Sequence, residues 1–355
     1  MRIGIVTPAP PHSYAGNSVT ALRWHDLLRE LGHEVEVTQA YTGQPWDVLV
    51  ALHARKSAPA IERCASDRPN VPIVLALTGT DLYPDLTTSG VNPHILELAA
   101  RFVVLQPLGV QQLPAHLRPR ARVIFQSVPP LPGVTPRTDV FEVALLAHLR
   151  PVKDPFRLAE AVHLLAPGSA IRVRHLGAPL QPEMAERARQ EMAAKPRYCW
   201  LGEVPRPEAL RILARCRLLA LTSWHEGGAN VISEAIAASV PVVSSRIPGS
   251  LGLLGADYPG YFTPGDTREL ADLLDRLERN EGGLLDDLRR RCAQLRPLFE
   301  PARERESWRA LLAELVQVVL EAEEGSDGTT DDPQNHNCER HHGQGATGKA
   351  ASDHH

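Results

Sequence analysis

The sequence lacks the short motifs that mark several common enzyme classes. It contains no GxxxxGK[ST] phosphate loop, no HExxH metal-binding pair and no GxSxG nucleophile turn. No GxGxxG follows the first β-rich run, and no DxD pair lies in the part of the chain predicted to fold. A site in which a metal bridges a diphosphate is therefore not indicated. We expect no metal and no resident cofactor.

Cysteine is scarce, and its placement indicates no disulfide framework. No CxxC pair occurs, and the odd total of five fits a reduced, cytoplasmic protein. The cysteines are Cys64, Cys199, Cys216, Cys292 and Cys338.

Long apolar runs are also missing. No stretch approaches the ~20 apolar residues that span a bilayer, so we expect no stable membrane insertion. The N-terminus, MRIGIVTPAPPHS, is a short apolar run ended by prolines, which predicts a strand and not a signal peptide. A net charge of -4 gives no indication of a nucleic-acid surface. The 355 residues suffice for two domains of ordinary size.

What is present is a repeated alternation of β-rich and helix-like runs. In the first half, RIGIVTP, HEVEVTQ, WDVLVAL, VPIVLALT, RFVVLQP and RVIFQSV alternate with helical or turn segments. WDVLVAL and VPIVLALT are almost entirely apolar, as strands buried on both faces are. This alternation predicts an α/β fold with a doubly wound, Rossmann-like parallel sheet.

A proline-rich stretch, VPPLPGVTPRTD, interrupts the alternation and predicts an interdomain linker. The alternation then resumes, which predicts a second Rossmann-like domain. We expect a first domain over residues 1–130 and a second over 140–296. Closing helices over 297–324 and a polar, disordered tail over 325–355 complete the predicted organisation.

The stretch HEGGANVISEA carries two glutamates, Glu226 and Glu234, eight positions apart. It follows a predicted strand and opens a helix, and ligands bind at such strand ends in parallel sheets. Gly227 and Gly228 leave backbone N–H groups bare for a phosphate or a sugar hydroxyl. Two readings stay open. Glu234 either binds a ribose diol or is solvated, as helical periodicity alone favours, and Glu226 either meets substrate or only stabilises the helix dipole.

A second stretch, AHLRPVKDP, follows the first strand of the second half. His148, Arg150 and Lys153 are potentially cationic, and a departing diphosphate needs such charge. The alternative is a solvated turn paired with Asp154. In the first half, three strand-end loops would face the same cleft. They offer a helix start, cations, hydroxyls and a carboxylate, from Gly16, Asn17, Arg23, His53, Arg55, Lys56, Thr78, Thr80 and Asp81.

These residues resemble a known family. HEGGANVISEA is similar to the E-x7-E motif of retaining GT-B glycosyltransferases of family four, and the likeness continues from YCWLGEV to SLGLLG and, more weakly, in GHEVEV and the Gly16-Asn17 turn. The resemblance implies two Rossmann-like domains facing across a cleft, with a nucleotide-sugar held by the second. It assigns catalytic roles to Glu226, Lys153 and His53. The implied donor-binding set is His148, Arg150, Lys153, Glu226, Gly227, Gly228, Ala229, Asn230 and Glu234. His148 stands where the family usually has an arginine, and whether Arg150 takes that role stays open.

The loops TPAPPHSYAGNSVTALRW, ALHARKSA and LTGTDLY, together with AHLRPVKDP, more closely resemble the selenosugar synthases of selenoneine biosynthesis. That likeness implies a UDP-sugar donor, UDP-GlcNAc or UDP-glucose, and selenophosphate as the acceptor that forms a carbon–selenium bond. The implied acceptor set is Gly16, Asn17, Arg23, Arg55, Lys56, Thr78, Thr80 and Asp81. The alternatives are the same fold with a thiol, hydroxy acid or sugar acceptor, a UDP-sugar epimerase, or a non-catalytic binder.

Overall fold

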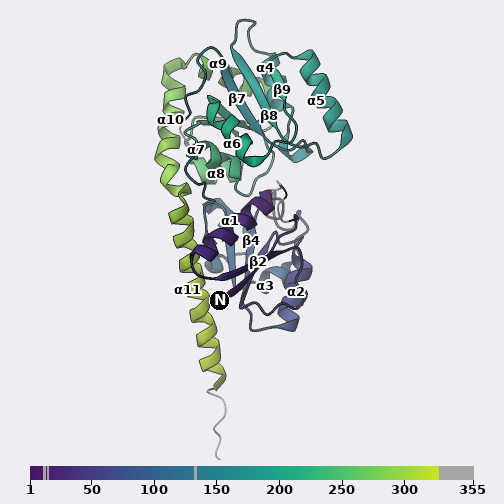
Figure 1. Cartoon of the computed structure of the whole chain (residues 1–355), viewed down its shortest axis with the longest axis vertical. Coiled ribbons are helices and arrows are strands. Elements are labelled where there is room, and N and C mark those ends of the chain that lie inside the picture. Colours follow the sequence, from purple (N-terminus) through teal and green to yellow (C-terminus); the bar gives the residue numbers. More distant parts are fainter. Residues whose placement is uncertain (11–12, 14–15, 132–133, 328–355) are drawn as a thin grey trace, which may run out of the picture.

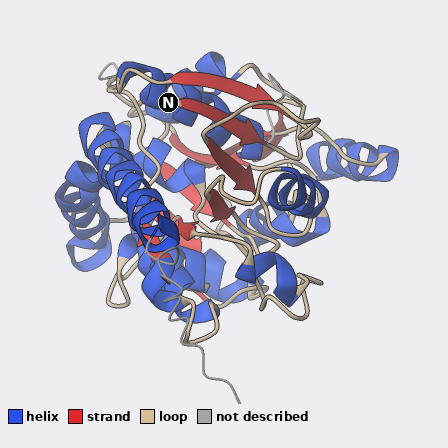
Figure 2. Cartoon of the chain, turned by 90° about the horizontal axis from the view of Figure 1, so that it is seen from below, coloured by secondary structure: helices blue, strands red, loops and turns tan. Residues whose placement is uncertain are grey.

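The computed structural model describes residues 1–10, 13, 16–131 and 134–327, with side chains as far as residue 317. Two α/β domains lie end to end along the long axis, and the last helices run down one side of both (Figure 1). Seen from below, helices lie around the strands (Figure 2). The predicted fold class, two Rossmann-like parallel-sheet domains, is confirmed.

The first domain is built on a parallel sheet with strand order β2-β1-β3-β4-β5-β6. Every predicted β-rich run of this half forms a strand: β1 (Arg2–Val6), β2 (Glu34–Thr38), β3 (Val48–Leu52), β4 (Ile73–Leu77), β5 (Arg101–Val104) and β6 (Ala121–Val123). All residues of β3 and β4 are buried, as their continuous apolar runs predict. The strand order reverses between β1 and β3, which is where ligands bind in such sheets.

Helices cover both faces of this sheet. α1 (Gly16–Glu30) packs on one face, and α2 (Ala58–Asp67) and α3 (Pro93–Glu97) pack on the other. Short 3₁₀ helices, η1 (Pro107–Gln112) and η2 (Arg118–Arg120), connect the last strands.

The second domain repeats the plan with strand order β12-β11-β10-β7-β8-β9, all parallel. Its strands are β7 (Phe141–Leu146), β8 (Ile171–Leu176), β9 (Tyr198–Trp200), β10 (Leu218–Leu221), β11 (Val242–Ser245) and β12 (Tyr261–Phe262). Its helices are η3 (Pro151–Lys153), α4 (Arg157–His163), α5 (Pro182–Ala194), α6 (Arg206–Arg215), α7 (Asn230–Ala237), α8 (Pro248–Leu254), α9 (Thr267–Glu278), η4 (Glu281–Gly283) and α10 (Leu284–Leu295). The order reverses between β7 and β10, so the loops after these two strands form the binding edge.

The closing segment returns to the first domain. After η5 (Arg296–Phe299), α11 (Pro301–Asp327) runs along that domain beside α1 (Figure 1). Trp24 of α1 and Trp308 of α11 are fully buried against each other, edge to face, with ring centroids 4.8 Å apart. The helix ends at Asp327, beyond residue 325, where we expect the tail to begin. Residues 328–355, which hold most of that predicted tail, lie outside the described residues.

No helix within the described residues is both long enough and apolar enough to cross a membrane.

Candidate active site

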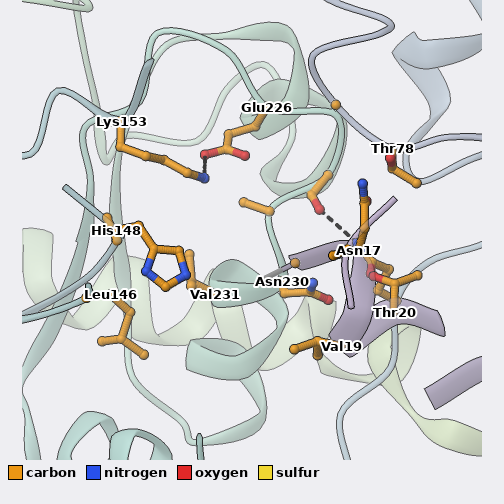
Figure 3. A pocket seen from close by; sticks show the side chains of 18 of the residues that line it. Asn17, Val19, Thr20, Thr78, Leu146, His148, Lys153, Glu226, Asn230 and Val231 are labelled. Atoms are coloured by element: carbon orange, nitrogen blue, oxygen red, sulfur yellow. Dashed lines mark hydrogen bonds and ion pairs between the residues drawn. The ribbon is translucent and has the colours of Figure 1, made fainter. Parts of the chain in front are cut away.

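A cleft with a volume of about 340 Å³ lies between the carboxyl edges of the two sheets. The second domain contributes the loops after β7, β8, β9 and β10 together with α6, and the first contributes α1 and the loops after β1, β3, β4, β5 and β6. Most predicted site residues line it. They are Gly16, Asn17, His53, Lys56, Thr78, Thr80, His148, Arg150, Lys153, Glu226, Gly228, Ala229, Asn230 and Glu234. Figure 3 shows Asn17, Thr20 and Thr78 on one side of it, and His148, Lys153 and Glu226 on the other.

Lys153 and Glu226 point toward each other and form an ion pair across the cleft wall (Figure 3). Ser223 Oγ donates to the same Glu226 oxygen at 2.6 Å. Thr222 Oγ1 donates to the carbonyls of Lys153 and Asp154, at 2.9 and 3.0 Å, and so fixes the short η3 turn. The loop after β10 therefore positions the lysine that the loop after β7 supplies.

His148 is held in one orientation by the loop that follows the neighbouring strand, β8. Its Nδ1 accepts a hydrogen bond from the Ala178 N–H at 3.1 Å, so in the neutral ring Nε2 carries the proton. Arg150 lines the cleft, and its buried Nε has no hydrogen-bond partner within the described part of the chain. A buried donor without a partner is costly, so an anion in the cleft would be stabilised by it.

His175 supports the loop that carries His148. It is fully buried, its Nε2 lies 2.9 Å from the Ala147 carbonyl, and its Nδ1 lies 2.6 Å from the Tyr198 hydroxyl. Burial lowers the pKa of His175 from 6.5 to about 4. The ring is therefore neutral at pH 7, with Nε2–H donating to Ala147 and Nδ1 accepting from Tyr198.

This shift predicts a pH-dependent stability. Because the folded pKa lies below the unfolded value, stability is complete above pH 6.5 and falls as the pH drops towards 4. We expect His175 to account for a loss of roughly 2 kcal/mol in unfolding free energy between pH 7 and pH 5. Urea unfolding at both pH values, for the wild type and for His175→Gln, measures this difference. The exposed His94→Gln is the control, and an equal pH dependence in wild type and His175→Gln would contradict the assignment.

Glu234 is not solvated, contrary to the reading that periodicity alone favours. It is 6% exposed, and its Oε1 accepts from Arg206 Nη2 at 2.7 Å and Nε at 3.2 Å. Arg206, at the start of α6, also lines the cleft and was missed in the sequence. Twenty-eight positions separate the two residues, so no local motif joins them.

The glycine pair lets the two domains approach closely. A Cβ on Gly227 would lie 2.6 Å from the Thr78 carbonyl carbon and oxygen, and a Cβ on Gly228 would lie 2.5 Å from the Leu105 Cβ. Gly227 itself does not line the cleft. The two domains can therefore pack this closely only because residues 227 and 228 have no side chain, whatever role their N–H groups have towards a phosphate.

His53 and Asp81 organise the first-domain side. His53 is 2% exposed, has a left-handed φ of 73°, and its Nε2 lies 3.1 Å from Thr80 Oγ1. Burial lowers the pKa of His53 below 6.5. Asp81 is fully buried and accepts from the backbone N–H groups of Ala54 and Gly79, at 2.9 and 2.8 Å. Asp81 therefore shapes two cleft loops from beneath, which corrects the expectation that it faces the acceptor.

Two predicted cations also point elsewhere. Arg23 is held by Glu304, Gln126 and Asn230, and Arg55 donates to the Ser89 carbonyl at 3.0 Å. Neither arginine lines the cleft, which corrects the expectation that both contact the acceptor. Of the cations predicted on the acceptor side, Lys56 does line the cleft.

No group of three or more metal-ligating side chains occurs among the described residues. The expectation of a metal-free reaction stays a prediction.

Two facing parallel-sheet domains, a ligand cleft between their carboxyl edges and a last helix that returns to the first domain define a GT-B fold. The solved structure of Alr3699/HepE from Anabaena, in complex with UDP and glucose, superposes with a TM-score of 0.69 at 17% identity, covering 88% of this chain and all of that one. A glycosyltransferase from Rickettsia africae superposes with a TM-score of 0.70 at 14% identity, covering 89% and 98%.

Sequence comparison narrows the class. Residues 134–295 match the family model "Glycosyl transferases group 1". "Glycosyltransferase 1 domain-containing protein 1" of Xenopus tropicalis is 24% identical over 297 residues, covering 75% of this chain and 84% of that protein. The matched region covers most of the second domain, and the superpositions show the GT-B fold for both domains together.

Proposed function

We propose that this protein is a glycosyltransferase that uses a UDP-sugar, UDP-GlcNAc or UDP-glucose, and transfers the sugar to selenophosphate. The observation that carries the donor half is the arrangement of Arg150, Lys153 and the buried Glu234 along one wall of the cleft. The Anabaena protein, which shares the fold, has been solved with UDP and with UDP-glucose. That likeness supports a uridine nucleotide as the donor.

The donor roles follow from position. Glu234, oriented by Arg206, accepts hydrogen bonds from the ribose hydroxyls. Arg150 and Lys153 stabilise the diphosphate as negative charge develops on it, with His148 beside them in the cleft. Glu226 and the backbone of residues 227–230 hold the sugar and the diphosphate. Arg150, whose buried Nε has no hydrogen-bond partner within the described residues, adds its positive charge to that of Lys153 beside the leaving group.

The acceptor half favours a nucleophile that needs no strong base. The one carboxylate predicted on that side, Asp81, is buried and bonded to backbone. His53 is nearly buried and has a lowered pKa, while Asn17, Lys56 and Thr78 offer donors to an anion. Selenophosphate is already anionic, and its selenium is a soft nucleophile. In the proposed step a selenium lone pair attacks the anomeric carbon, the C–Se bond forms, and the C–O bond breaks as UDP leaves with the electron pair.

The test is a product assay. The protein is incubated with each UDP-sugar and selenophosphate, and we expect UDP release together with a selenium-containing sugar detected by mass spectrometry. Parallel incubations contain a thiol, a hydroxy acid or a sugar in place of selenophosphate. Turnover with one of these and none with selenophosphate would replace our acceptor with another. UDP release that is independent of any acceptor would favour hydrolysis or epimerase chemistry. The absence of any turnover would favour a non-catalytic binding protein.

A further inference from the structure

Gln126, which follows β6 at the edge of the first sheet, lies at the junction of the two domains. It is 5% exposed, and three hydrogen bonds use its side-chain amide. Thr20 Oγ1 and Arg23 Nη2, both from α1, donate to Gln126 Oε1 at 2.6 and 2.7 Å. Gln126 Nε2 donates to the Gly228 carbonyl of the second domain at 2.8 Å. One side chain thus joins α1 to the loop that precedes α7.

The orientation of this amide is fixed by its partners. A guanidinium can only donate, so the atom facing Arg23 is the amide oxygen. A backbone carbonyl can only accept, so the atom facing Gly228 is the amide nitrogen. A carboxylate at position 126 would satisfy α1 but present an oxygen to the Gly228 carbonyl.

The rest of the junction holds Gln126 in place. Glu304 of α11 is 1% exposed and accepts from Arg23 Nε at 3.0 Å, Trp24 Nε1 at 2.7 Å and the Ser127 N–H at 2.7 Å. The returning helix therefore anchors α1 and the chain segment beside Gln126 at one buried carboxylate. Arg23 also donates to Asn230 Oδ1 of the second domain at 3.2 Å.

The Gly228 carbonyl, which accepts the bond from Gln126, belongs to the loop that carries the donor-side residues 226–230. Gly227 and Gly228 contact the first domain at Thr78 and Leu105 with no room for a side chain. Packing alone is non-directional, whereas a buried hydrogen bond demands one position of the Gly228 carbonyl. The bond from Gln126 therefore supplies a directional constraint on the loop itself, beside the bond from Arg23 to Asn230 at the start of α7.

We propose that Gln126 is a positioning residue that locks residues 226–230 against α1 and so aligns the two halves of the cleft. That this loop holds the sugar donor rests on the proposed function, but the bridge between the domains does not. Closure of this kind excludes water and completes the site, so loss of the bridge should favour hydrolysis of the donor over transfer.

The test compares hydrogen–deuterium exchange of the full chain in Gln126→Glu, Gln126→Met and wild type. The Glu variant keeps acceptors for Thr20 and Arg23 and loses only the donor to Gly228, while the Met variant loses all three bonds without adding charge. We expect amide exchange in residues 226–230 to be about tenfold faster in both variants, as loss of one hydrogen bond predicts. Gln181→Glu, an exposed glutamine at the start of α5 without a side-chain cap bond, is the control.

Two results would overturn the proposal. One is wild-type exchange at residues 226–230 in Gln126→Met. The other is faster exchange confined to α1 and residues 124–127, because Gln126 would then act only inside the first domain. With a UDP-sugar present, the ratio of hydrolysis to transfer should rise about tenfold in the same variants. If the wild type turns over no UDP-sugar, the proposed function fails, and the exchange measurement still decides the bridge.

Discussion

Replacing Lys153 by alanine is expected to reduce kcat by about 10²–10³-fold, with a much smaller change in KM. Removing one preorganised charge or donor from a transition-state site has an effect of this size. The charge matters most while the diphosphate departs, so the loss should fall on turnover more than on ground-state binding. Steady-state kinetics of UDP release, with the acceptor identified in the product assay, measures both constants.

A matched control is available in Lys195. Its side chain is 16% exposed against 19% for Lys153, and each lysine pairs with one glutamate, Glu191 and Glu226 respectively. Lys195 does not line the cleft, so Lys195→Ala should leave kcat near the wild-type value. Near-normal turnover in Lys153→Ala would remove the lysine from the proposed mechanism. An equal loss in both variants would show that a disturbed fold causes the effect.

The fold follows from sequence because its signals are local. An apolar run of five or six residues bounded by turn residues forms a strand wherever its neighbours bury it, and all the predicted runs do so. β12 was missed because it is only two residues long. Burial of both faces of β3 and β4 was readable from composition alone.

The cleft was predictable only in part. Motif residues such as Lys153 and Glu226 lie at strand ends, and topology brings parallel strand ends to one edge. Arg23 and Asp81 were placed facing the acceptor because their buried partners are not adjacent in sequence. Arg23 pairs with Glu304 across 281 positions, and Asp81 bonds to Ala54 across 27. Gln126 and Arg206 were missed for the same reason, because their partners are distant in the sequence and no motif surrounds them.

Glu234 shows how packing reverses a prediction from periodicity. Glu234 shares its helical face with Asn230 and Ala237, and that pattern predicts a solvated side chain. In the structure Asn230 and Glu234 line the cleft, and Glu234 pairs with Arg206. A carboxylate that is 6% exposed must be compensated, and a single guanidinium on one oxygen leaves the other oxygen for a ligand.

We therefore expect Glu234→Ala to weaken binding of UDP by roughly 1–3 kcal/mol, since ribose hydroxyls would lose a charged acceptor. Isothermal titration calorimetry with UDP measures this directly and needs no acceptor. Glu142→Ala is the matched control, because Glu142 is also buried and also pairs with an arginine, Arg174, at 2.8 Å, but does not line the cleft. That variant should lose stability and keep UDP affinity. Unchanged UDP affinity in Glu234→Ala would instead make the Glu234–Arg206 pair a purely structural element of the second domain.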